Sequence, residues 1–159
     1  MKQIRIGTTM RTILTTLCLL IASMTASYAN KIAPQFTPNN IMSVAVVIND
    51  NAIDGCWTNL GEVKRYAEDK LELSGFTVKK IGDEDIHYLM TITVNSMRQV
   101  FPCYGSVGIE IFRPYLIDGV SGIFVVAEGG ATFNTGGSAN NSNLLVLKYL
   151  RQFFEAFPK

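Results

Sequence analysis

The chain has 159 residues, of which 14 are basic and 13 acidic, and its formal net charge is +1. It contains no run of four or more Lys or Arg, which argues against nucleic acid or an anionic membrane surface as its partner. Its length fits one domain that can bury a single core.

The first 29 residues have the pattern of a secretory signal peptide. Three basic residues and no acidic one stand before or at the start of an uncharged apolar run at 12–22. Ser27 and Ala29 then occupy the small-residue positions of a cleavage site, so the mature chain would begin at Asn30. The apolar run is about half of the roughly 20 residues that span a bilayer. We therefore expect a periplasmic or secreted protein with no stable membrane anchor after cleavage.

Cleavage would change both the charge and the cysteine content. It removes three of the 14 basic residues and none of the 13 acidic ones, which leaves a net charge of −2. It also removes Cys18. A lipoprotein cysteine follows a small residue, whereas Cys18 follows Leu17, so the sequence does not favour a lipid anchor.

Two cysteines, Cys56 and Cys103, remain in the mature chain. In an oxidising compartment they allow one disulfide, which would close a loop of roughly 48 residues and stabilise the fold by about 4 kcal/mol in the chain-entropy model. The alternative is a reactive thiol at Cys56, because the helix predicted just after it would favour the thiolate. No C-x-x-C spacing and no nearby histidine accompany it, so we favour the disulfide.

The first elements of the mature chain are a strand and a helix. A polar segment at 30–41 with two prolines would be extended. The apolar, β-branched run at 42–49 predicts a strand buried on both faces. At 60–74 apolar residues recur at helical spacing with charged residues mostly opposite, which predicts an amphipathic helix. Asn59 or the preceding threonine would cap its start, and Gly75 fits a left-handed C-terminal cap.

A series of strands is predicted next. They fall at 76–81, 86–97, 106–117 and 122–128, with a short fifth at 131–135. Apolar residues alternate with mostly polar ones in several of them, so one face would pack on a core. The Asp-Gly pair at 118–119 is typical of a tight hairpin turn. An antiparallel meander is the expected result.

The chain ends in a predicted helix at 144–157. Its apolar stripe, which we expect to cover the sheet rather than a membrane, consists of Leu147, Leu150, Phe153, Phe154 and Phe157. The segment Gly129–Asn143 before it is rich in Gly, Asn and Ser. It could bind an anion at the helix N-terminus, but it lacks a phosphate-loop pattern, so we favour a flexible turn.

These elements predict an α+β fold. We expect two layers, with a largely antiparallel sheet of four to six strands and both helices on one face, in the order β-α-β-β-β-β-α. The extended segment 30–41 would precede a single domain at 42–159.

The sequence offers one candidate metal or acid–base site. His87, the only histidine, follows Asp83, Glu84 and Asp85. Such residues can bind a metal or exchange protons, but a single histidine without a second ligand cluster favours a solvated turn. No G-x-S-x-G elbow or other catalytic pattern is present. We therefore expect no catalytic residue, cofactor or metal, and favour a non-enzymatic protein.

Four aromatic residues near turns are candidates for a binding surface. They are Trp57, Tyr104, Phe112 and Tyr115. Aromatic side chains are enriched among interface anchors, although the same residues could belong to the core.

Four segments resemble a loosely defined set of small exported bacterial proteins of unknown function. They are YLMTITVN at 88–95, YGSVGIEIFR at 104–113, ATFNTGG at 131–137 and the L-x2-L-x2-F-F-x2-F helix at 147–157. The resemblance spans about residues 60–157 and implies a bacterial, periplasmic α+β domain. It carries over no functional residue, and Phe133 stands where a Trp is expected in this set.

The leading functional hypothesis is a non-enzymatic exported module that binds another envelope or secreted protein or takes part in envelope assembly. It depends on the export signal, the missing catalytic pattern and the aromatic residues near turns. One alternative is a thiol-dependent protein or enzyme that uses Cys56. Another is an inhibitor or immunity-type partner of a secreted enzyme.

Overall fold

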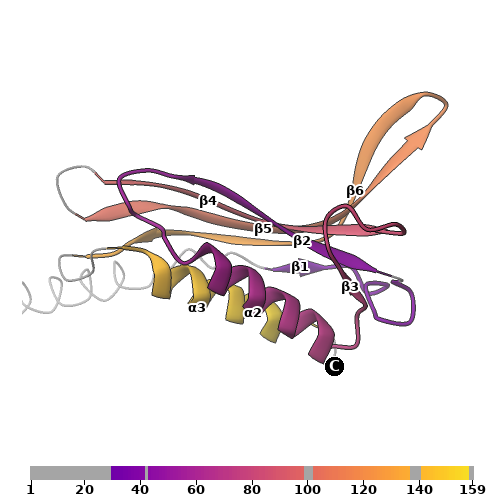
Figure 1. Cartoon of the computed structure of the whole chain (residues 1–159), viewed down its shortest axis with the longest axis horizontal. Coiled ribbons are helices and arrows are strands. Elements are labelled where there is room, and N and C mark those ends of the chain that lie inside the picture. Colours follow the sequence, from indigo (N-terminus) through magenta and orange to yellow (C-terminus); the bar gives the residue numbers. More distant parts are fainter. Residues whose placement is uncertain (1–29, 42, 99–101, 137–140, 158–159) are drawn as a thin grey trace, which may run out of the picture.

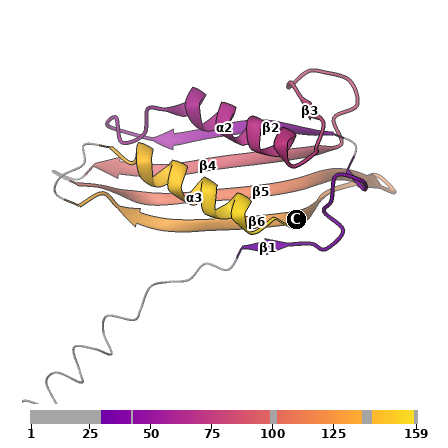
Figure 2. The same ribbon diagram turned by 90° about the horizontal axis from the view of Figure 1, so that it is seen from below.

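The structure, a computed structural model, describes residues 30–41, 43–98, 102–136 and 141–157. This described part forms a curled sheet with two helices on one face (Figures 1 and 2). The α+β class is therefore confirmed. The predicted signal peptide and Ala29 lie outside the described residues.

The elements follow one another along the chain with short connections. Their bounds are β1 Lys31–Ile32, β2 Val44–Ala52, α2 Leu60–Leu73, β3 Val78–Lys79, β4 Tyr88–Arg98, β5 Cys103–Ile117, β6 Val120–Asn134 and α3 Asn143–Glu155. The segment at 30–41 was expected to be only extended, yet it contributes the short strand β1. The predicted strands at 122–128 and 131–135 are one continuous strand, β6.

The sheet is mixed rather than largely antiparallel. Its six strands have the order β1-β6-β5-β4-β2-β3. Strand β2 runs parallel to both β3 and β4, and the remaining pairs are antiparallel. The physical reason is α2, which carries the chain back along the sheet so that the next strands start from the same end as β2. The predicted antiparallel sheet is thus wrong on this side.

Helix α2 begins and ends close to the predicted positions. Asn59 is the N-cap residue, although its side chain donates to Glu62 Oε2 at 2.8 Å rather than accepting from the helix backbone. Gly75 has φ +90° and follows the last turn, where the N–H of Phe76 donates to the carbonyl of Leu71. A residue with a side chain would be strained in this conformation, which explains the glycine.

The core lies between the two helices and one face of the sheet. Its fully buried members on the strands include Val44, Val46, Met90, Ile92, Val94, Ile109 and Ile111, and those on the helices include Val63, Ala67, Leu71, Val146, Leu150 and Phe153. Helix α3 therefore covers the sheet, as predicted. Neither helix in the described part has the length and hydrophobicity to cross a membrane.

Strands β5 and β6 leave the plane of the sheet partway along their length. Their register shifts between Ile111 and Phe112. Beyond this irregularity the two strands continue as a pair, and Figure 1 shows them projecting on the side away from the helices. A bulge of this kind bends a strand pair and increases its twist. We call residues 112–125 the projecting hairpin.

Candidate functional site

Two of the three cysteines of the chain are joined. Cys56 and Cys103 form a disulfide with their Cα atoms 5.7 Å apart, and both residues are buried. Ser142 donates from its backbone N–H and from its hydroxyl to the carbonyl of Cys56, at 2.7 and 2.8 Å. The disulfide thus ties the segment before α2 to β5 and to the start of α3. Cys56 has no free thiol here, which leaves the thiol-dependent alternative without its nucleophile.

The acidic run before His87 forms a turn. Asp83 accepts a hydrogen bond from the backbone N–H of Lys80 at 2.8 Å. The Ser43 hydroxyl lies 3.0 Å from His87 Nδ1 and accepts from the backbone N–H of the same histidine at 3.1 Å. Among the described residues, no three His, Cys, Asp or Glu side chains gather as metal ligands would. These bonds hold the connection between β3 and β4.

Half of the glycine-rich segment before α3 belongs to a strand. Gly129 and Gly130 lie within β6, and residues 137–140 lie outside the described residues. A Cβ atom at Gly129 would lie 2.8 Å from Phe153 Cδ2. Gly129 therefore lets α3 pack directly on the strand. The turn favoured at 129–143 is wrong for residues 129–134, which pair with β5 as part of β6, whereas the strand expected at 131–135 is present up to Asn134.

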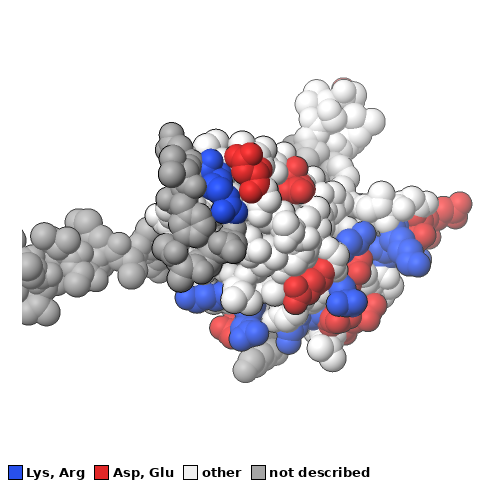
Figure 3. All heavy atoms as spheres, turned by 60° about the vertical axis from the view of Figure 1, so that its left-hand side comes forward, with Lys and Arg blue, Asp and Glu red and all other residues white. Residues whose placement is uncertain are grey.

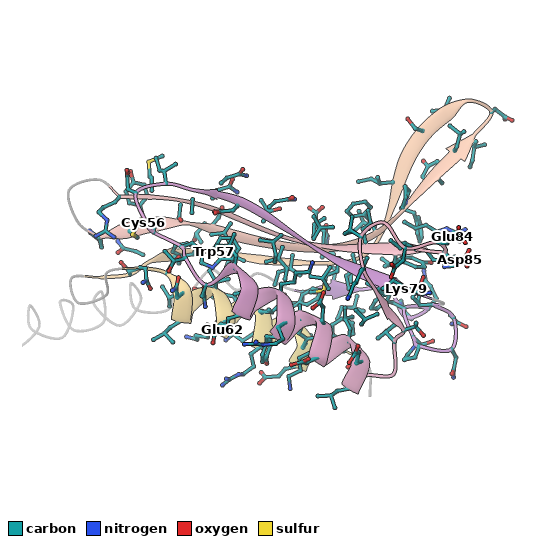
Figure 4. The ribbon with its side chains drawn as sticks, in the orientation of Figure 1. Cys56, Trp57, Glu62, Lys79, Glu84 and Asp85 are labelled. Atoms are coloured by element: carbon teal, nitrogen blue, oxygen red, sulfur yellow. A yellow bond between two sulfur atoms is a disulfide. The ribbon has the colours of Figure 1, made fainter. Side chains whose placement is uncertain are left out.

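The four candidate aromatic residues do not form one surface. Trp57 is buried at the disulfide end of the sheet (Figure 4), so its predicted surface role is wrong. Tyr104 lies at the same end, on β5. Phe112 and Tyr115 lie on the projecting hairpin. A binding role for these last three residues stays a prediction.

The projecting hairpin concentrates the exposed apolar side chains of the molecule. Seven of its large apolar residues are exposed: Tyr115, Leu116, Ile117, Val120, Ile123, Phe124 and Val125. Only five other such residues are found in the rest of the described chain. Leu116 and Val120, beside the turn, are 71% and 67% exposed.

Both faces of the hairpin are apolar. Strand pairing places Phe112, Pro114, Leu116, Ser121, Ile123 and Val125 on one face, and Arg113, Tyr115, Ile117, Val120, Gly122 and Phe124 on the other. A water-exposed hairpin normally carries polar residues on at least one face. The only charged residues in 112–125 are Arg113 and Asp118. In Figure 3 the hairpin, at the upper right, is almost entirely white.

The turn of the hairpin is well defined. Asp118 and Gly119 have φ values of +51° and +79°, and they connect Ile117 to its partner Val120. Positive φ at both central residues is the geometry that matches the twist of a two-residue hairpin. The Asp-Gly prediction is therefore confirmed. The turn holds apolar side chains on both flanks of the tip.

A hairpin with these properties is expected to contact another molecule. Large exposed apolar patches on monomeric proteins mark interaction sites. An isolated two-stranded ribbon is at best marginally stable in water, so a covering surface would stabilise it. The sequence analysis named Phe112 and Tyr115 as candidates for a binding surface but did not single out the hairpin as a whole. The signal was present in 112–125, where apolar residues occupy both alternating sets.

Comparisons with known proteins identify the fold alone. No family model matches the sequence, and no curated protein matches it. The PelC dodecamer from Paraburkholderia phytofirmans superposes with a TM-score of 0.53 at 13% identity, over 84% of this chain and 99% of that chain. A variant of this dodecamer gives 0.52 at 12% identity, over 80% and 94%. A hypothetical protein from Chlamydia trachomatis reaches 0.43 at 8% identity, over 72% and 94%.

Proposed function

We propose that this chain is an exported, non-enzymatic assembly module that binds another protein of the cell envelope through its projecting hairpin. The observation that carries the proposal is the exposure of apolar side chains on both faces of residues 112–125. The disulfide supports export, because such bonds persist in oxidising compartments outside the cytoplasm.

The PelC structures support an assembly role in particular. PelC shares the fold over most of both chains, and its structures are dodecamers. A fold of this kind can therefore build contacts between protein chains.

The charge of the hairpin favours a protein partner over a lipid surface. Segments that bind anionic membranes carry several Lys or Arg around their apolar residues. Here Arg113 is the single basic residue of the hairpin, and the acidic Asp118 occupies its tip. If the hairpin inserted into a membrane, the charged Asp118 carboxylate at its tip would enter before the apolar residues, which is unfavourable.

Photo-crosslinking in the native cells tests the proposal. A photoreactive phenylalanine analogue replaces Leu116 at the hairpin or Leu144 on α3, a leucine that is 81% exposed and far from the hairpin along the chain. We expect protein adducts from position 116 and few from position 144. Equal yields of protein adducts at positions 116 and 144 would contradict the proposal that the hairpin is the contact surface. Adducts from position 116 to lipid alone would contradict it as well.

A further inference from the structure

The sheet carries a second apolar feature, at the end opposite the hairpin. It is an open hollow of about 490 Å³ on the face that the helices leave uncovered. Its lining includes Asn51, Ile53, Asn95, Met97, Tyr104 and Thr132. Ile53 and Met97 are 54% and 45% exposed.

The lining of this hollow matches the hairpin in chemistry. It contains no charged side chain, and its polar members are neutral amides and hydroxyls. A larger groove of about 790 Å³ lies between the helices, but Lys70, Arg151 and Glu155 line it. A hairpin bound there would take water from two cations and a carboxylate, and its tip offers Asp118 as its one charged partner for them. The uncharged hollow is the better receptor for Leu116, Ile117 and Val120.

The hairpin cannot reach the hollow of its own chain. Tyr104 at the hollow and Phe112 at the hairpin base are both on β5, eight residues apart, which corresponds to about 27 Å of strand. From Phe112 to Ile117 the hairpin extends over five residues, or roughly 17 Å. A hairpin folded back over the sheet would still stop short. A hairpin that binds in this hollow therefore belongs to another molecule.

We infer that the projecting hairpin of one copy of this chain binds in the hollow of a second copy. This inference rests on the proposed function and names the partner. The apolar residues beside the turn contact Ile53, Met97 and Tyr104 of the second copy. The Asp118 carboxylate lies near the amides and hydroxyls of Asn51, Asn95 and Thr132, which can donate to it. Each copy gives one hairpin and receives one.

The geometry allows two arrangements of this contact. The hairpin projects from one end of the sheet (Figure 1), and the residues that line the hollow, such as Met97 on β4 and Tyr104 on β5, lie at the opposite ends of their strands. Two copies related by a two-fold axis can therefore exchange hairpins face to face, and a head-to-tail order would build a larger ring. Both arrangements require the same two surfaces.

Mixing two defective variants tests the contact. Leu116→Asp disables the hairpin and Met97→Asp disables the hollow, whereas Leu144→Asp changes an exposed leucine outside both. We expect the purified parent chain to be a dimer or larger by light scattering after gel filtration. Each of the first two variants should weaken association about 100-fold or more, because its new carboxylate would be buried against apolar side chains, away from the amides and hydroxyls that can donate to Asp118. Their equimolar mixture should give a 1:1 pair, because one intact hairpin then meets one intact hollow.

The outcomes separate this inference from the proposed function. Thermal melting first shows that each variant is folded. A mixture that stays monomeric, or a Met97→Asp variant that associates like the parent, overturns the hairpin-in-hollow contact. A further variant, Leu73→Asp, changes the groove between the helices. If only this variant loses association, the groove is the receptor and the hairpin-in-hollow contact is wrong. A monomeric parent whose position 116 crosslinks to a different protein in cells overturns self-association and leaves the proposed function standing.

Discussion

Strands β5 and β6 contain two regions of similar composition and opposite environment. Up to Ile111, one face of the pair packs on the core below the helices, and its residues Val107, Ile109, Ile111, Ala127 and Phe133 are buried. Beyond the register shift, residues 112–125 are equally apolar, but no helix covers either face. The burial of an apolar strand thus depends on what packs against it. Where no part of the same chain packs on such a segment, another molecule is expected to cover it.

The largest expected loss in the free energy of unfolding comes from truncating a buried phenylalanine, and an exposed phenylalanine is its control. Phe153 on α3 is buried against the sheet, and Phe124 on the hairpin is half exposed. Phe153→Ala should lower the free energy of unfolding by about 3–5 kcal/mol. Phe124→Ala should change it by less than about 0.5 kcal/mol, as surface substitutions usually do. Urea unfolding measures both. A large loss with Phe124→Ala would show that the hairpin folds onto its own domain.

The disulfide gives the next largest effect. Replacing Cys56 and Cys103 together by serine should cost roughly 2–4 kcal/mol, because the unfolded chain gains freedom. The melting temperature of the double variant is compared with those of the parent chain with and without reductant. Unchanged melting would show that the network around Ser142 holds this end of the sheet without the bond.

Two glycines of the same strand pair should give the smallest effect. Gly129→Ala places a Cβ against the side chains of Asn30 and Phe153 and should destabilise the protein by about 1–3 kcal/mol. Gly108→Ala is the matched control, because a Cβ there has no neighbour within 4 Å. It should be neutral or stabilise slightly, since alanine has less freedom to lose. Equal losses at both positions would contradict the direct packing of α3 on β6.

Several features follow from residues close together in the sequence. Asp118-Gly119 forms its turn and Gly75 ends α2, because positive φ is a local property of these residues. The two helices have an apolar stripe at helical spacing, and this pattern does not depend on the rest of the fold. Because Cys18 falls in the predicted signal peptide, the sequence favoured a single pairing, Cys56 with Cys103, and the structure has this disulfide.

Other features were decided only in three dimensions. Strand β2 is parallel to β4 because α2 returns the chain to the same end of the sheet, and neither strand carries this direction in its own residues. Trp57 is buried in the core next to the half-cystine Cys56, although it stands beside a turn in the sequence. The hairpin became a candidate because the register shift after Ile111 lifts one apolar segment out of the sheet. The hollow is lined by residues from four different strands, which only the folded sheet brings together. The exposure of a residue depends on which helices and strands pack against it, and only the tertiary structure decides which of them do.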